Sequence, residues 1–165
     1  MKAKGKRQRA KVRRELHEPD PDSPVLTWEE VNRTHRVRNG VYHRGGRLVS
    51  LLTDFGRINP CYPDALSADG GSIVYTGEGR HGDQHLSPGN RALLSAVESG
   101  HAVPLFNKLG TGRWQLTGRW RVASAEHRFD ETEQRMLWRF TLQKGSSSKL
   151  KSSKLKTEVQ GRGQP

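Results

Sequence analysis

The sequence predicts an α+β fold, a twisted and partly closed antiparallel β-barrel with one central helix over about residues 88–99 and short flanking helices. Segments that alternate apolar and polar residues predict strands at Val103–Phe106, Trp114–Val122 and Arg135–Leu142. Strands therefore dominate the second half of the chain. Closure of the sheet would hide its edges, which a small domain otherwise leaves exposed.

Capping and turn residues place the elements of the first half. Thr27 as N-cap and Glu30 as the other half of a capping box predict a short helix. Arg47–Leu52 and Ser72–Tyr75 are apolar and contain β-branched residues, so both predict strands. Residues 57–72 contain two prolines and a Gly-Gly pair, which predict a loop.

The central helix has the clearest boundaries in the chain. Ser87 is a natural N-cap, and Pro88 suits the first helical position. Gly100 ends the helix, because glycine readily adopts the left-handed conformation found there. One helical face carries an apolar stripe of Ala92, Leu93, Ala96 and Val97.

Charge divides the 165-residue chain into three parts. Residues 1–14 hold eight Lys/Arg and no acid, and residues 144–165 hold six Lys/Arg and one acid. The stretch 15–143 has fifteen basic and sixteen acidic residues. We therefore expect a basic disordered tail with a Pro-rich linker over 1–24, a folded domain over 25–143, and a basic Ser/Gly-rich tail over 144–165. Such tails attract polyanions in a salt-dependent way; the alternative is that they serve solubility alone.

Cysteine use and hydropathy limit the class of protein. Cys61 is the single cysteine, which excludes an internal disulfide and a multi-cysteine zinc site. No apolar run has the length of a signal peptide or membrane span. We expect a soluble, cytoplasmic protein without a membrane partner.

The glycine-rich run Tyr75–Gln84 is the most informative segment, because dense glycines let a backbone approach another surface closely. Tyr62, Asp64 and Tyr75 accompany it. A base read outside the helical stack needs flat surfaces on its faces and an acceptor for its exocyclic amine. The alternative is that both tyrosines are barrel-wall aromatics and Asp64 forms an Asx-turn.

The same run carries groups that enzymes use. His81 and His85 have the spacing of two metal ligands on a helix, but they fall among glycines, so we expect no metal there. Glu78 and Asp83 match no nuclease motif, and an Asp in a glycine loop more often binds backbone N–H groups. No cofactor is expected.

A separate basic segment spans residues 33–47, with five arginines, two histidines and no acid. This composition is typical of a loop that contacts a nucleic-acid backbone. The alternative is a solvated charged face.

Several motifs in order resemble the SRA (SET- and RING-associated, or YDG) domain, a reader of 5-methylcytosine. They are Cys61-Tyr62-Pro63-Asp64, Asp69-Gly70-Gly71, Tyr75-Thr76-Gly77-Glu78-Gly79, Asp83-Gln84-His85-Leu86 and Asn90-Arg91-Ala92-Leu93. The resemblance extends over about residues 47–142 and is firm over 62–94. It implies an SRA/PUA-like barrel in which an extruded base lies between two tyrosines.

The resemblance also implies site residues. The base pocket would consist of Tyr62, Asp64, Tyr75, Thr76 and Gly77. DNA-backbone or loop contacts would come from Arg33, Arg36, Arg38, Arg44, Arg47, Gly79, Arg80, His81, Asp83, Gln84, Asn90 and Arg91. Asp64 and Asp69 are alternatives for binding the base amine, with Asp64 favoured. No catalytic residue is expected.

One departure from the family concerns sequence context. Eukaryotic members carry a longer segment between GxG and DQ that reads CpG context, whereas only Arg80-His81-Gly82 stands there in this chain. The likeness is nearer to bacterial SRA-like domains, which are often fused to HNH nucleases. No HNH segment is found, so we expect a nucleoid-associated, non-catalytic reader of duplex DNA carrying 5-methylcytosine, acting with a separate nuclease or effector. Alternatives are a PUA-like RNA-binding module and a nuclease or glycosylase acting on modified DNA.

Overall fold

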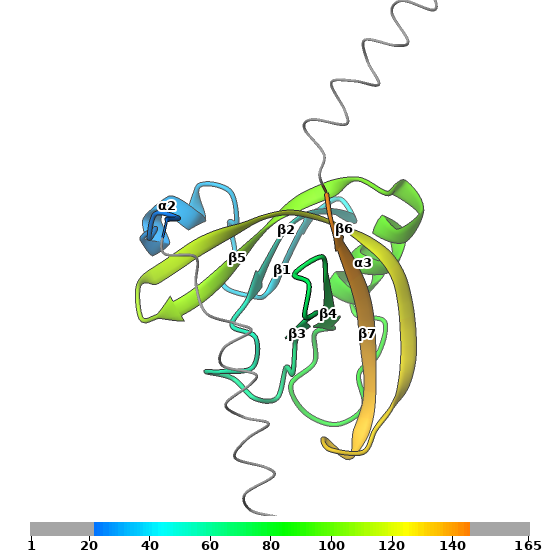
Figure 1. Ribbon diagram of the computed structural model, residues 1–165. Coiled ribbons are helices and arrows are strands. Elements are labelled where there is room, and N and C mark those ends of the chain that lie inside the picture. The colour runs from blue at the N-terminus through cyan, green and yellow to red at the C-terminus, as the bar shows by residue number, and fades with distance from the viewer. Residues whose placement is uncertain (1–21, 146–165) are drawn as a thin grey trace, which may run out of the picture.

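The computed structural model describes residues 22–145, so the predicted basic tail and most of the predicted linker, as well as residues 146–165, lie outside the described part. The described chain forms one seven-stranded mixed sheet with one main helix (Figure 1). Its elements in order are α2 (Trp28–Asn32), β1 (Val41–Arg44), β2 (Arg47–Thr53), β3 (Ala65–Leu66), β4 (Ser72–Thr76), α3 (Pro88–Ser99), β5 (Ala102–Gly110), β6 (Arg113–Asp130) and β7 (Arg135–Lys144).

The sheet order is β1-β2-β5-β6-β7-β4-β3. The predicted α+β class is confirmed, but the expectation of an antiparallel sheet throughout was wrong, because β2 and β5 pair in parallel. A parallel neighbour requires a crossover, and the chain makes it through β3, β4 and α3. Closure of the sheet into a barrel is not shown: β1 and β3 end the strand order.

Strand β6 gives the molecule its curved shape. It first pairs with β5, through Arg121, and then with β7, from Trp120 onward. A register shift between Val122 and Ser124 accompanies this change of partner, and such irregularities bend a strand. Figure 1 shows β6 crossing the molecule and turning down beside β7.

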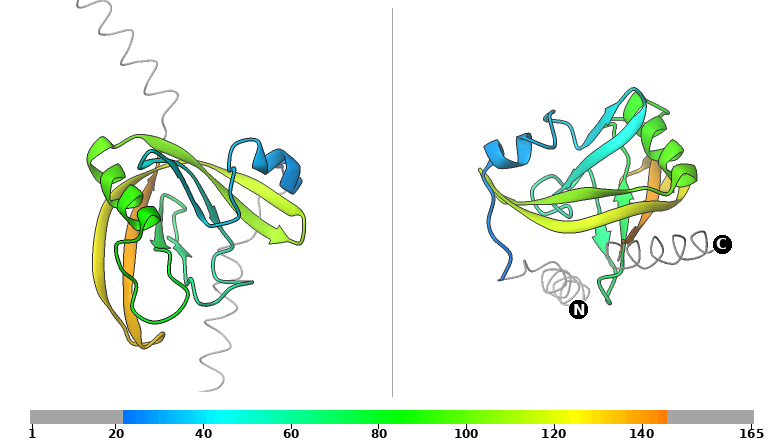
Figure 2. Two further views of the ribbon diagram at one scale, coloured as in Figure 1. Left: turned by 180° about the vertical axis from the view of Figure 1, so that it is seen from behind. Right: turned by 90° about the horizontal axis from the view of Figure 1, so that it is seen from above.

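The two helices lie at opposite ends of the sheet (Figure 2). Helix α3 has the bounds that the sequence predicts, since Asn90 N donates to Ser87 Oγ and Gly100 adopts a left-handed φ of 64°. At α2 the predicted capping box is present, with Glu30 N bonded to Thr27 Oγ1 and Thr27 N bonded to Glu30 Oε1. No helix within residues 22–145 is long and apolar enough to cross a membrane.

Two apolar clusters stabilise this arrangement. The larger cluster joins the sheet to α3 and includes Leu51, Leu93, Leu105, Trp120 and Phe140. In the smaller cluster, α2 packs against the β5–β6 hairpin through Val31, Phe106 and Trp114. The larger cluster also includes Tyr75 at the end of β4, which is the position of the site described below.

The basic segment 33–47 does not form one loop. Residues 33–40 follow α2, and the rest forms the β1–β2 hairpin, whose turn contains Gly45 and Gly46 with φ of 57° and 82°. Two successive positive φ values are characteristic of the tight turns that match strand twist. The arginine-rich composition predicted a loop here, whereas Val41–Arg44 forms a strand.

A substitution at Gly77 tests how closely the glycine loop packs against the sheet. A Cβ at this position would lie 2.6 Å from Asn90 Oδ1 and 2.9 Å from Trp138 Cβ. We expect Gly77→Ala to lower the free energy of unfolding by about 1–3 kcal/mol, as overpacking does. In Gly110→Ala the nearest neighbour is Arg113 Nη1 at 3.8 Å, so this control should change stability by less than about 0.5 kcal/mol. Urea unfolding measures both; equal stability of the two variants would contradict the packing described here.

Candidate functional site

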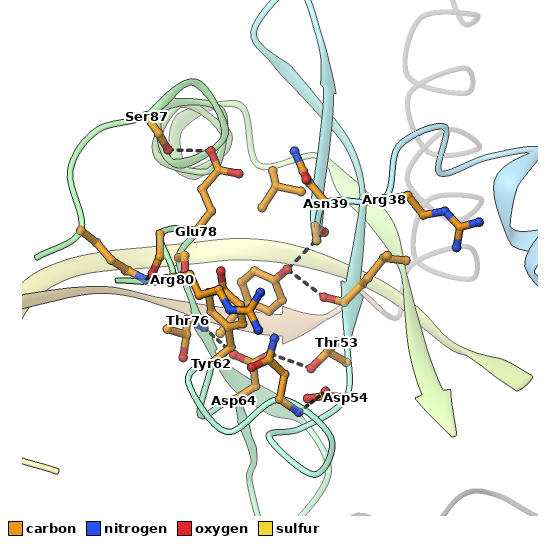
Figure 3. A pocket seen from close by; sticks show the side chains of 18 of the residues that line it. Arg38, Asn39, Thr53, Asp54, Tyr62, Asp64, Thr76, Glu78, Arg80 and Ser87 are labelled. Atoms are coloured by element: carbon orange, nitrogen blue, oxygen red, sulfur yellow. Dashed lines mark hydrogen bonds between the residues drawn. The ribbon is translucent and has the colours of Figure 1, made fainter. Parts of the chain in front are cut away.

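A cavity of about 730 Å³ opens where β2 and β4 end, between the loop that precedes β3 and the glycine loop that follows β4 (Figure 3). All five residues predicted for the base pocket line it: Tyr62, Asp64, Tyr75, Thr76 and Gly77. They come from two segments, the loop that precedes β3 and the end of β4 with the glycine that follows it. The fold therefore brings together the residues that the sequence motifs singled out.

The buried carboxyl of Asp64 is part of the lining of this cavity. Thr53 Oγ1, at the end of β2, donates to Asp64 Oδ2 at 2.6 Å. The backbone N–H of Thr76, at the end of β4, donates to Oδ1 at 2.6 Å. Burial raises the pKa of Asp64 to about 7, although the hydrogen bonds from Thr53 and Thr76 oppose the shift. Asp64 therefore bonds to the ends of two strands, and this role differs from the Asx-turn predicted as the alternative.

Asp69, the alternative to Asp64, lies elsewhere. It is exposed, and its Oδ1 accepts from Ser67 Oγ at 2.7 Å and from Gly71 N at 2.9 Å. The Ser67 and Gly71 hydrogen bonds hold the pKa of this carboxyl below its usual value. Asp69 does not line the cavity, so of the two acids only Asp64 is placed to meet a ligand there.

The two tyrosines differ in how they are held. Tyr75 is only 3% exposed, and its hydroxyl donates to the carbonyls of Leu52 (2.8 Å) and Gly40 (3.2 Å). Burial raises the pKa of Tyr75 well above its ordinary value, so the phenol stays a neutral donor. Tyr62 is half-buried on the loop before β3, and burial also raises its pKa. Tyr75 is therefore held rigidly in the cavity wall, which is the alternative role predicted for it. Tyr62 forms the part of the cavity wall that faces solvent.

Gln84 and Asn90 hold the glycine loop in shape. Gln84 Nε2 donates to the carbonyls of Gly77 (2.7 Å) and Gly79 (3.0 Å), and its Oε1 accepts from Trp138 N. Asn90 Oδ1 accepts from Glu78 N, and its Nδ2 donates to two loop carbonyls. Both side chains are buried and bonded within the protein. Of the two roles predicted for them, DNA-backbone contact or loop contact, the structure shows the loop contact.

The two acidic side chains of the glycine loop also accept hydrogen bonds within the protein. Glu78 Oε2 accepts from Ser87 Oγ at 2.6 Å and from Gly89 N at 2.9 Å, which ties the loop to the first turn of α3 (Figure 3). Asp83 Oδ1 accepts from Met136 N at 2.8 Å, so the expected bond to a backbone N–H is confirmed. Neither carboxylate is paired with the other as an acid–base couple.

The histidines His81 and His85 line the cavity mouth and are exposed. They lie outside any helix, as expected, so the i, i+4 spacing has no geometric meaning here. Within residues 22–145 no group of three or more His, Cys, Asp or Glu side chains is arranged to hold a metal ion.

Arg135, at the start of β7, was missed by sequence reasoning. It is buried, and its Nη1 donates to the carbonyls of Gly79 (2.7 Å) and Gly82 (3.0 Å). Its Nη2 donates to the carbonyl of Cys61 at 2.8 Å, next to Tyr62. One guanidinium thus joins the two loops that border the cavity. No sequence signal distinguishes Arg135 from Arg139 on the same strand, because its partners are backbone carbonyls.

The predicted DNA-contacting arginines fall into two groups. Arg38 and Arg80 line the cavity, and the Arg38 guanidinium lies 4.2 Å from the centre of the Trp28 ring. Arg44 and Arg47 sit at the turn of the β1–β2 hairpin, whereas the opposite end of β2, at Thr53, borders the cavity. Arg47 and Thr53 are six positions apart along the strand, which is roughly 20 Å. The structure therefore does not bring Arg44 or Arg47 to the cavity.

The remaining predicted contacts lie outside the cavity or at its rim. Arg33 and Arg36 are exposed near α2 and do not line it. Arg91 is exposed on α3, and its Nε donates to the carbonyl of Leu86 at 2.9 Å. Gly79 lines the cavity with a φ of 127°, a value that favours glycine. Lys108 of β5, which the sequence did not single out, also lines it.

The raised pKa of Asp64 predicts how stability depends on pH. The folded state favours the neutral carboxyl, so this contribution is complete below the ordinary pKa of 3.8 and is lost as pH rises through about 7. The difference between a pKa of 3.8 and a pKa of about 7 corresponds to about 4 kcal/mol in the free energy of unfolding. In Asp64→Asn the amide can accept from Thr76 N and donate to Thr53 Oγ1, so both contacts persist without titration.

Urea unfolding from about pH 4 to about pH 8 measures this difference. We expect the wild-type protein to lose up to about 4 kcal/mol more than Asp64→Asn over that range. Parallel pH profiles for the two proteins would show that Asp64 titrates normally.

Comparisons with known proteins bear on the family and the fold of this chain. A protein-family model described as "ScoMcrA-like, SRA domain" matches residues 35–160. The SUVH5 SRA domain in complex with hemi-methylated CG DNA superposes with a TM-score of 0.63 at 20% identity, covering 74% of this chain and 85% of that one. The comparison with curated proteins gave no match.

Two further structures extend the comparison. The SUVH5 SRA domain bound to fully hydroxymethylated CG DNA has a TM-score of 0.59 at 21% identity, covering 77% of this chain and 92% of that one. The modification-dependent restriction endonuclease TagI has a TM-score of 0.63 at 20% identity, covering 79% of this chain and 51% of that one. These structures share the fold, and the family match over residues 35–160 shows that the chain belongs to the ScoMcrA-like SRA domain family.

Proposed function

We propose that this protein is a non-catalytic reader of modified DNA, which holds an extruded 5-methylcytosine between Tyr62 and Tyr75. One observation carries the proposal: a solvent-open cavity gathers two tyrosines and a buried carboxyl from separate segments. Enzymes and readers that act on a single base take it out of the stack and bind it by stacking and by its edge. The likeness to SUVH5 domains solved with methylated DNA supports the same class of ligand.

Asp64 supplies the edge recognition. Cytosine offers an amine donor at N4 and an acceptor at N3. With a pKa of about 7, Asp64 is present in both protonation states near neutral pH. Its neutral form offers an acceptor and a donor side by side, which matches that edge, and its ionised form still accepts from N4.

The energies of such a complex are balanced. Base–aromatic stacking contributes roughly 1–3 kcal/mol per base, and extrusion costs a few kcal/mol. Phosphate contacts from Arg38 and Arg80 at the cavity, and from the basic termini, add sequence-independent attraction. Burial of the methyl group adds about 0.8 kcal/mol, which is about fourfold, and a close fit around it adds more, so we expect a preference for methylated DNA of several-fold to tens-fold.

Context selectivity is weak in this proposal. Only Arg80, His81 and Gly82 separate Gly79 from Asp83, and Arg135 binds the carbonyls at both ends of this link. A segment this short and this fixed cannot reach neighbouring base pairs. TagI is described as a modification-dependent endonuclease of which the chain matches about half, so DNA cleavage, if coupled to this reader, is assigned to a separate nuclease or effector.

Tyr62 provides the direct test, because it is the solvent-facing wall. At fixed salt, the full chain should bind a duplex with one 5-methylcytosine more tightly than the unmethylated duplex. Tyr62→Ala should weaken methylated binding by roughly 1–3 kcal/mol, whereas Tyr62→Phe keeps the ring and should retain the preference. Tyr75→Phe removes the bonds to Leu52 and Gly40 and should mainly lower stability.

Fluorescence anisotropy with matched duplexes and a matched RNA measures these affinities. Equal affinity of the wild-type protein for both duplexes would overturn the 5-methylcytosine assignment. Tight RNA binding that survives Tyr62→Ala would favour the PUA-like RNA-binding alternative. Cleavage or base release from the methylated duplex would favour an enzyme.

A further inference from the structure

Arg44 and Arg47, at the turn of the β1–β2 hairpin, lie away from the cavity and have no role in the proposed base pocket. Both side chains are exposed. Leu48 packs into the larger apolar cluster, and adjacent residues of a strand face opposite sides, so Arg47 points away from that cluster. Arg44 pairs directly with Arg47 across the hairpin, which puts the two arginines on one side of the sheet.

Strand β6 carries two further arginines on the same side of the sheet. Trp120 belongs to the larger apolar cluster. Its neighbours Arg119 and Arg121 therefore point to the opposite side, as Arg47 does. Both are exposed, and they stand two residues apart, which is about 7 Å along a strand. Each of these two arginines can therefore contact a different group of an extended ligand.

The two pairs of arginines adjoin one another across β5. The start of β5 lies beside the start of β2, because His101 Nε2 donates to the carbonyl of Leu48 at 2.8 Å. The next residue, Ala102, pairs with Arg121 of β6. One strand therefore separates Arg47 from Arg121, and neighbouring strands lie about 4.8 Å apart. Together the two pairs form one surface, which we call the arginine face: Arg44, Arg47, Arg119 and Arg121.

Acidic side chains are scarce around the arginine face. The segments that form it and the strand beside it contain no Asp or Glu: residues 31–53, 99–125 and 134–145. Two acids lie in adjoining elements, Glu98 in the last turn of α3 and Asp69 in the β3–β4 turn. The ion pairs within residues 22–145 involve Arg128 and Arg135, so no carboxylate of this part of the chain is paired with the arginine face.

Two guanidinium groups of the arginine face are held in place by the protein. Arg119 Nη2 donates to the carbonyl of Ala102 at 2.9 Å, and Arg121 Nη2 donates to Gln143 Oε1. Each of these bonds uses one of the five N–H donors of a guanidinium, so donors remain for another acceptor. Because a guanidinium can donate two parallel N–H bonds to a phosphate, the arginine face is suited to phosphate groups.

The surroundings of the arginine face favour a duplex as the source of these phosphates. Trp120, the aromatic residue between Arg119 and Arg121, is only 2% exposed. A single strand needs exposed aromatic rings on which its bases stack, and a membrane-binding surface needs apolar side chains that enter the lipid. The large apolar side chains exposed within residues 22–145 lie outside the β1–β2 turn and outside residues 118–122. A duplex needs neither feature, because its phosphates lie on the outside.

We propose that the arginine face binds the phosphate backbone of a second DNA duplex while the cavity holds the modified one. The face lies at the start of β2 and the cavity at its end, roughly 20 Å away along the strand. In Figure 1, β7 ends beside this face at the top of the molecule, and the loops that border the cavity lie in the lower half. A short duplex at the cavity therefore leaves the arginine face open. This contact goes beyond the proposed function, since it requires neither extrusion nor methylation.

Bridging of two duplexes tests this proposal. A short duplex with one 5-methylcytosine is fixed to beads, the full chain is bound to it, and a short unmethylated duplex with a fluorescent label is added. We expect the wild-type protein to retain the labelled duplex. The double variant Arg44→Gln/Arg47→Gln should bind it at least about tenfold more weakly near 0.15 M salt, because counterion release makes each phosphate contact worth about fivefold there. The slope of log K against log salt should become shallower by about 2.

The double variant Arg113→Gln/Arg128→Gln is the matched control. Both arginines are exposed, and neither belongs to the arginine face or lines the cavity. They lie at the two ends of β6 and remove the same number of charges. Because exposed charges more than about 8 Å away are largely screened, the control should retain the labelled duplex within about twofold of the wild-type protein. Thermal unfolding checks the fold: Arg44 and Arg47 are exposed, so their variant should unfold at the wild-type temperature.

The outcomes separate this proposal from the proposed function. A wild-type protein that retains no labelled duplex, or equal retention by the two double variants, overturns the arginine face and leaves the base pocket intact. An RNA duplex or anionic vesicles bound more tightly than DNA, and released by Arg44→Gln/Arg47→Gln, would overturn the choice of DNA as the partner. A wild-type protein without preference for methylated DNA contradicts the proposed function, whereas bridging of two unmethylated duplexes would still be observed. A loss confined to Arg44→Gln/Arg47→Gln supports the arginine face.

Discussion

The carboxyl of Asp64, bonded to Thr53 Oγ1 and Thr76 N, is the contact on which the geometry of the site depends. It holds together the ends of β2 and β4, which are not neighbours in the sheet. Burial of this acid is unfavourable for its charged form, and two hydrogen bonds offset part of that cost. The residue that holds the strands together also lines the cavity, so the proposed recognition would depend on the same group as stability.

Local sequence patterns predicted the local structure well. The bounds of α3 follow from Ser87, Pro88 and Gly100, whose capping roles involve only residues a few positions away. The residues predicted for the base pocket were likewise selected from motifs, because the loop before β3 and the end of β4 are close in both sequence and space. All five line one cavity, and the family match over residues 35–160 confirms the resemblance to the SRA domain.

Long-range pairing could not be predicted from patterns. The parallel contact of β2 with β5 joins strands separated by about fifty residues, and nothing in either strand specifies its direction. Arg135 reads as an ordinary strand residue until the fold places Gly79, Gly82 and Cys61 around it. The arginines of residues 33–47 were grouped by composition, whereas the hairpin carries Arg44 and Arg47 away from the site.

In the proposed complex a modified cytosine leaves the duplex and enters the cavity beside Asp64. A crystal structure of the full chain with a duplex carrying one 5-methylcytosine would show the position of this base. We expect the base outside the stack, its ring against Tyr62 and its N4 within hydrogen-bond distance of the Asp64 carboxyl. A methylated base that remains paired within the duplex, with the cavity empty, would contradict it.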